Sequence, residues 1–120
     1  MVESPNLISN TIIKEIIKKS LFTERQVEII LNQLNIQKTD FSITKGAYYR
    51  QVNQSRNKLL GLYYSVILLK GLDVLIPEDI DVINKLSEQV SVIKNSDVFP
   101  ERGNEIISVI EALVNRACRL

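Results

Sequence analysis

The segment SITKGAYYRQVNQSRNKLLGLYYSVILLKGLDVL, residues 42–75, decides the fold that we predict for this chain. Its first half is polar and basic, and its second half is the most apolar stretch of the sequence. One set of residues recurs in it at alternating steps of four and three, which is the spacing of a single helical stripe. The set is Tyr48, Val52, Ser55, Leu59, Leu62, Val66 and Leu69. We therefore predict one long helix with a polar end and an apolar end.

Turn and capping residues mark the limits of this long helix. Ser42 or Thr44 can cap its first turn, and Gly46 leaves room there for a close backbone or phosphate. Gly71 is the natural stop. Gly61 lies in mid-helix, where glycine is unfavourable, and indicates a bend or a close crossing by another helix.

Four further helices are predicted around the long one, and each carries apolar residues at helical spacing. Ser4 and Pro5 are typical of a helix start, and residues 23–26 form a capping-box pattern. Residues 35–43 show no sustained period and read as a connection. The predicted ranges are about 6–20, about 24–34, about 77–94, and a last helix beginning at Pro100. The prediction is an all-α single domain, residues 1–120, whose C-terminal helices pack the core.

The composition is that of an ordinary globular chain of 120 residues, with 45% hydrophobic and 24% charged residues. No apolar run approaches the roughly 18 residues of a membrane span, and the N-terminal residues lack a secretion signal. We expect a cytoplasmic, nucleoid-associated protein that does not bind a membrane.

Catalytic and metal-binding residues are scarce. Histidine is absent and Cys118 is the single cysteine, which excludes an internal disulfide and argues against a zinc site. Glu78, Asp79 and Asp81 form the densest acidic cluster, but they follow Pro77 in a first helical turn, where the helix dipole favours acids. We therefore expect no enzyme, no metal and no cofactor.

The charge is distributed unevenly along the chain. Residues 1–70 hold ten Lys and Arg against five Asp and Glu, whereas residues 71–120 hold five against nine. No acid occurs between Asp40 and Asp73. A basic half of this kind favours a polyanionic partner, and the alternative is solvated charge spread unevenly by chance.

The polar end of the long helix carries residues able to read DNA bases. Arg50 and Gln54 suit bidentate contacts to guanine and adenine, and Asn53 and Asn57 can also read adenine. At about 100° per residue, most of these side chains lie roughly opposite the apolar stripe. The alternative is a solvated polar face, which any exposed helix can have.

Four neighbouring residues suit contacts to the DNA backbone. Lys45, Arg56 and Lys58 are predicted to neutralise phosphates, and Tyr49 to reach a sugar-phosphate or a thymine methyl group. The predicted DNA-binding residues are thus Lys45, Tyr49, Arg50, Asn53, Gln54, Arg56, Asn57 and Lys58.

A family resemblance runs through residues 21–60. The segment ITKGAYYRQVNQSRNKL resembles the recognition helix of helix-turn-helix proteins related to the fourth region of bacterial sigma factors, and LFTERQVEII resembles their first helix. The matching recognition-helix residues are Ile43, Thr44, Lys45, Gly46, Tyr48, Val52, Ser55, Arg56 and Leu59. The pattern is also similar to small archaeal helix-turn-helix regulators. It departs from the family at residues 35–43, where a full second helix is expected. The resemblance implies a transcriptional regulator that reads the major groove.

The apolar end of the long helix predicts extensive burial. Leu60, Tyr63, Tyr64, Ile67 and Leu68 flank the stripe, so this part is apolar nearly all round and needs cover on most sides. The helices in residues 61–120 can supply that cover within one chain, or a homodimer can complete it. A dimer also suits helix-turn-helix proteins, because two recognition helices then meet successive major-groove turns.

Two other functions are compatible with the same sequence. One is an all-α protein–protein interaction module that does not bind nucleic acid. The other is an RNA-binding helical domain that stacks bases on tyrosines. We rank the RNA hypothesis last, because Tyr48 lies on the apolar stripe and Tyr63 and Tyr64 are expected to be buried.

Overall fold

The computed structural model describes residues 6–94 and 100–120, and the described part is all-α. In chain order it contains the 3-10 turn η1 (Leu7–Ser9), α1 (Thr11–Lys19), α2 (Glu24–Gln33), α3 (Lys45–Gly71), α4 (Pro77–Ile93) and α5 (Pro100–Ala117). The predicted five-helix architecture with a long central helix is confirmed. The predicted cap at Ser4 and Pro5 lies outside the described residues.

The first α-helix begins five residues later than the isoleucine spacing predicts. Asn10 Oδ1 accepts hydrogen bonds from the backbone N–H groups of Ile12 (3.0 Å) and Ile13 (3.2 Å) and so starts α1 at Thr11. Asn6 caps the preceding turn η1 in the same way. The predicted start near residue 6 is wrong, because an asparagine that caps a helix also separates it from the residues before it.

The predicted caps of the next two helices are confirmed. Thr23 Oγ1 accepts from the Gln26 N–H (3.2 Å), and Gln26 Oε1 accepts from the Thr23 N–H (3.0 Å), which completes the capping box before α2. Thr44 Oγ1 accepts from the Ala47 N–H (3.1 Å), so Thr44 caps α3. Ser42 is not the cap and has a positive φ of 50°.

A tight corner joins α3 to α4. Helix α3 ends at Gly71 as predicted, and Asp73 has a φ of 62°. The Leu69 carbonyl accepts from both N–H groups at residues 74 and 75 (2.9 and 3.0 Å). Helix α4 then begins at Pro77, with the Asp79 carboxylate accepting from the Ile76 N–H (3.0 Å).

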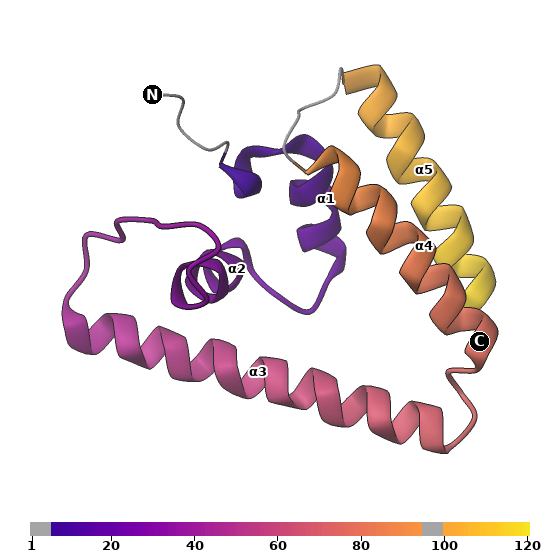
Figure 1. The fold of residues 1–120 in the computed structure, drawn as a ribbon, viewed down its shortest axis with the longest axis horizontal. Helices are drawn as coiled ribbons and strands as arrows, with labels where there is room; N and C mark the ends of the chain where they lie inside the picture. Colours follow the sequence, from indigo (N-terminus) through magenta and orange to yellow (C-terminus); the bar gives the residue numbers. More distant parts are fainter. Residues whose placement is uncertain (1–5, 95–99) are drawn as a thin grey trace.

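The core lies among the N-terminal elements and the C-terminal pair of helices. Helix α1 packs against α5, which also packs against α4, and η1 contacts both α1 and α2 (Figure 1). Asn10 ties the start of α1 to the end of α4, because its Nδ2 donates to the carbonyls of Ile93 (3.1 Å) and Lys94 (3.2 Å). The buried apolar side chains are Ile8, Ile12, Ile17, Ile29, Leu86 and Ile107.

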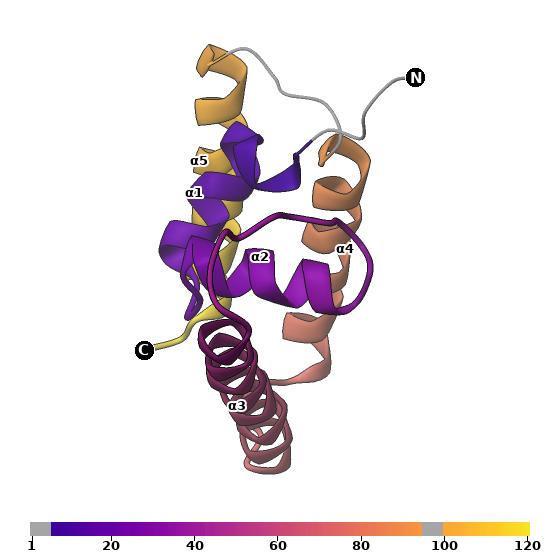
Figure 2. The ribbon, with the colours of Figure 1, turned by 90° about the vertical axis from the view of Figure 1, so that its left-hand side faces the viewer.

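Helix α3 runs along an outer edge of the molecule, crosswise to α2 (Figures 1 and 2). Its polar half packs on α2, and its apolar half continues to the corner, from which α4 turns back toward α1 and α5. Of the two ways in which the apolar half could be covered, burial within one chain is not found, since Tyr63 is 63% exposed, Tyr64 71% and Ile67 67%. The physical reason is that α4 leaves the corner away from α3 and packs on α5, so neither helix lies along the apolar half of α3.

Two further properties of α3 follow from this arrangement. A Cβ atom built on Gly61 would meet no atom within 4 Å, so the predicted close crossing by another helix is not seen there. Despite its apolar half, α3 is not apolar enough to cross a bilayer, and no other helix in the described residues meets the length and hydropathy that a membrane span requires.

Candidate nucleic-acid interface

Helix α2 holds the polar half of α3 through side-chain hydrogen bonds at both ends of their contact. At one end, the Tyr48 hydroxyl accepts from Asn32 Nδ2 (2.7 Å) and donates to Gln33 Oε1 (2.9 Å). At the other end, the Lys58 ammonium donates to Gln26 Oε1 (3.0 Å). These bonds span almost three turns of α3 and fix its rotation about its own axis.

Ser55 is 1% exposed and lies between Tyr48 and Lys58, the two residues of α3 that bond to α2. Its hydroxyl is buried without a hydrogen-bond partner, and the same is true of Gln51 Oε1. The small side chain of Ser55 leaves room for α2 to approach α3 closely. Its position on the predicted apolar stripe is therefore explained by packing.

The opposite face of α3 presents the predicted base-reading side chains to solvent. Arg50, Asn53, Gln54 and Asn57 are all exposed, within the first four turns of the helix. The hydrogen bonds found among the described residues do not involve these four side chains, so their donors and acceptors are available to a ligand. This arrangement agrees with the helical wheel predicted from the sequence.

Uncompensated positive charge surrounds that face. Lys45 and Arg56 are exposed, and neither takes part in the four ion pairs of the described residues. Tyr49 is 48% exposed, and its ring meets the Tyr48 ring edge-on with centroids 5.4 Å apart. A phosphate placed beside this part of α3 would meet cations and no carboxylate from the helix itself.

Lys58 does not lie with the other seven predicted residues. Its side chain is half-buried against α2, where the ammonium lies 6.0 Å from the centroid of the Phe22 ring in addition to its bond to Gln26. The structure thus gathers Lys45, Tyr49, Arg50, Asn53, Gln54, Arg56 and Asn57 on the exposed side of α3 and turns Lys58 away from them.

The connection between α2 and α3 contains no helix, and its conformation is set by side chains. Phe41 packs on the Tyr48 ring (centroids 5.6 Å apart), and the Arg25 guanidinium lies 5.1 Å from the Phe41 ring centroid. Asn32 Oδ1 accepts from the Thr39 N–H (3.1 Å). Where the sigma-related pattern has a full second helix, this chain has a loop over residues 34–44, longer than the three or four residues usual in a helix-turn-helix.

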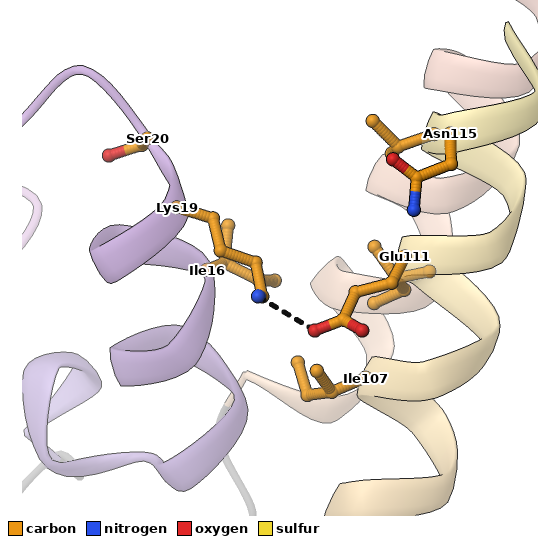
Figure 3. Close-up of a pocket in the computed structure, with 8 residues that line it drawn as sticks. Ile16, Lys19, Ser20, Ile107, Glu111 and Asn115 are labelled. Carbon is orange, nitrogen blue, oxygen red and sulfur yellow. Dashed lines mark ion pairs between the residues drawn. The ribbon is translucent and has the colours of Figure 1, made fainter. Parts of the chain in front are cut away.

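A hollow lies between α1 and α5, with a volume of about 510 Å³ (Figure 3). Its walls are largely apolar, and the ion pair between Lys19 Nζ and Glu111 Oε1 (2.7 Å) bridges it. The hydrogen bond and the charge of Glu111 raise the pKa of Lys19 above its usual 10.5. No local pattern in the sequence indicates this pair, because its two residues come from helices at opposite ends of the chain. The lining residues are Ile16, Lys19, Ser20, Ile107, Ile110, Glu111, Val114 and Asn115.

The predicted acidic cluster after Pro77 contains one residue with a structural role. Asp79 caps α4, and no group of three or more His, Cys, Asp or Glu side chains there is arranged to hold a metal ion. The absence of catalysis stays a prediction.

Comparisons with known proteins add no family to this picture. The chain matches no protein-family model, no curated protein and no solved structure.

Proposed function

We propose that this chain is a non-enzymatic, DNA-binding transcriptional regulator that presents the first four turns of α3 to the major groove. The observation that carries the proposal is the exposed face with Arg50, Gln54 and Asn57, directed away from α2. An α-helix fits the major groove, where guanidinium and amide groups can form bidentate contacts with guanine and adenine.

Charge and position support the same proposal. The segment between Asp40 and Asp73 holds five cations and no acid, and α3 lies at an edge of the molecule where a duplex can approach (Figure 2). The resemblance of residues 21–60 to sigma-related helix-turn-helix proteins points in the same direction. The loop over residues 34–44 gives this protein an approach to DNA that differs from theirs.

A gel-shift titration tests the proposal after selection of a preferred duplex from a random pool. Arg50→Ala and Gln54→Ala should each weaken binding to the selected duplex by roughly 5- to 100-fold, and binding to random DNA much less. Lys85→Ala, which removes an exposed cation from α4, is the matched control and should bind the selected duplex almost normally. Undetectable affinity at low salt, or equal binding by all three variants, would contradict DNA recognition by α3.

A protein–protein interaction module is the second candidate, and the exposed apolar half of α3 favours it. In that case the titration shows no salt-dependent DNA binding. The exposure of Tyr63 and Tyr64 removes one of the two reasons for ranking RNA binding last, whereas Tyr48 stays engaged with Asn32 and Gln33. However, residues 59–69 carry no cation, whereas single-stranded nucleic acid is bound in positively charged grooves.

A further inference from the structure

An apolar face of α3 remains uncovered after the chain has folded. It consists of Leu60, Tyr63, Tyr64, Ile67, Leu68 and, just beyond the helix, Leu72, whose exposed fractions lie between 38% and 71%. Taking roughly 200 Å² for a fully exposed large side chain, this face presents on the order of 700 Å². That area exceeds the roughly 300–600 Å² of the largest apolar patch on a typical monomer and approaches the roughly 800 Å² that each partner buries in a stable complex.

We propose that a second copy of this chain covers this face, and that the two α3 helices pair antiparallel about a two-fold axis near Tyr64. Residues 59–69 carry no charge, so the face can pack against itself without burying an ion. Self-complementarity of this kind is what a two-fold contact requires.

The charges at the two ends of the face select the antiparallel orientation. Arg56 precedes Leu60, the first residue of the face, by about one turn, and Asp73 follows the helix at the corner. Antiparallel pairing about Tyr64 places Arg56 of each copy beside Asp73 of the other, giving two attractive pairs. Parallel pairing would place Arg56 beside Arg56 and Lys70 beside Lys70, which is repulsive.

The positions around the helix allow such a dimer to present both polar halves to one side. At about 100° per residue, Arg50, Gln54 and Asn57 all lie on one side of the centre of the helical residues of this face, at roughly 50° to 110° from it. The two-fold axis of such a pair is perpendicular to the helices and to the line that joins them. Rotation about this axis turns the contact faces toward each other. Side chains that point along the axis keep their direction, so both copies direct these polar residues to the same side of the dimer.

The spacing along the helix then matches successive turns of a DNA groove. The centre of the polar group lies about ten residues before Tyr64, or about 15 Å at about 1.5 Å per residue. The two polar halves are therefore about 30 Å apart, close to the roughly 34 Å between successive major-groove turns. This step rests on the proposed DNA binding, whereas the pairing of the two helices does not.

Sedimentation of the full chain without DNA tests the pairing. We expect a dimer, with twice the 13.7 kDa chain mass, at micromolar concentration. Tyr64→Glu places two like charges at the axis and should weaken the dimer by at least about 100-fold. Val109→Glu changes an exposed apolar residue of α5 in the same way and should leave the dimer intact. Tyr64 is largely exposed in the single chain, so the variant should fold, which circular dichroism checks.

The orientation has its own test in the same assay. Arg56→Glu should weaken dimerisation by up to about tenfold, and Arg56→Glu with Asp73→Lys should restore it. Nitroxide labels in a Cys118→Ser background should be closest at Tyr64→Cys and should be offset by about 20 Å along the helix axis at Asn57→Cys, which lengthens their separation by roughly 13 Å. Equal separations at both sites would show parallel pairing and overturn the proposed orientation.

The outcomes distinguish this inference from the proposed function. A chain that is monomeric at tens of micromolar and indifferent to Tyr64→Glu overturns the pairing, whether or not it binds DNA. A dimer with no affinity for DNA overturns the proposed function and leaves the pairing standing. Monomers that bind lipid vesicles or a different protein through Tyr64 would likewise contradict a second copy as the occupant of this face.

Discussion

The guanidinium of Arg119 lies 3.3 Å from the carboxylate of Asp79, and the same guanidinium donates to the Val74 carbonyl (2.8 Å). Arg119 follows α5, whereas Asp79 opens α4 and Val74 belongs to the corner after α3. The carboxylate is buried and also caps α4. This cluster fastens the corner to the C-terminal end of α5.

Asp79→Ala should therefore destabilise the fold more than Arg119→Ala does. The first change removes the helix cap and the ion pair and should cost about 1–2 kcal/mol of unfolding free energy. The second leaves the cap in place, and its exposed guanidinium should cost less than about 1 kcal/mol. Urea denaturation of both variants and of the double variant gives the coupling energy. Equal losses would show that the cap contributes little.

Tyr48→Phe should lower the unfolding free energy by about 1–2 kcal/mol, because it removes the bonds to Asn32 and Gln33 and leaves their amide groups without this partner. Tyr49→Phe is the matched control, since Tyr49 is exposed and should have almost no effect on stability. Thermal and urea unfolding measure both. If the two variants lose the same stability, the Tyr48 hydroxyl does not fasten α3 to α2.

Ser55→Ala should raise the unfolding free energy by up to about 1 kcal/mol, since it removes a buried hydroxyl without a partner and improves helix propensity. Ser55→Leu should instead cost about 1–3 kcal/mol, because the larger side chain pushes α2 away from α3. Chemical denaturation compares the pair. A destabilising Ser55→Ala would show that the hydroxyl is hydrogen-bonded in solution.

The ion pair between Lys19 and Glu111 predicts a pH dependence at alkaline pH. Since Glu111 raises the pKa of Lys19 above 10.5 in the folded chain, the stabilisation is fully present below pH 10.5. This stabilisation is lost as the pH rises through the pKa that Lys19 has in the folded chain. The melting temperature of the parent should fall more steeply above pH 10.5 than that of Glu111→Gln. Identical pH profiles would contradict a coupling between these groups.

Lys45→Ala should weaken binding to selected and random DNA alike, and lower the slope of log affinity against log salt by about one. Lys58→Ala should leave that slope unchanged, because its ammonium is turned toward Gln26. Gel shifts at several salt concentrations measure both slopes. A fall of one unit for Lys58→Ala would place its side chain on the phosphates.

Local signals in the sequence were sufficient to predict most helix limits. Thr23, Thr44, Gly71 and Pro77 act through neighbours within a few residues, so a capping box or a stop can be read without the rest of the fold. Asn10 escaped prediction because the isoleucine spacing continues across the break that it makes. Periodicity reports which residues share a face, and not where a cap interrupts the helix.

The exposed polar face of α3 was also predictable, because it depends only on helical geometry and on which stripe packs. The exposure of Tyr64 was not, since it depends on the direction in which α4 leaves the corner. That direction is set by the backbone at Asp73 and by contacts with α5. The position of Lys58 likewise depends on Gln26 and Phe22, which belong to the other side of a tertiary contact.

The bonds from Asn10 to the carbonyls of Ile93 and Lys94 join positions 83 and 84 residues apart. Since α1 also packs against α5, the first helix gains its long-range partners only after the last helix has been synthesised. During synthesis on the ribosome, α1 lacks these long-range contacts, whereas α2 and α3 can already dock through contacts close in the sequence. The order of assembly thus runs from the middle of the chain outward, and the closing step is a high-contact-order event that should set the folding rate.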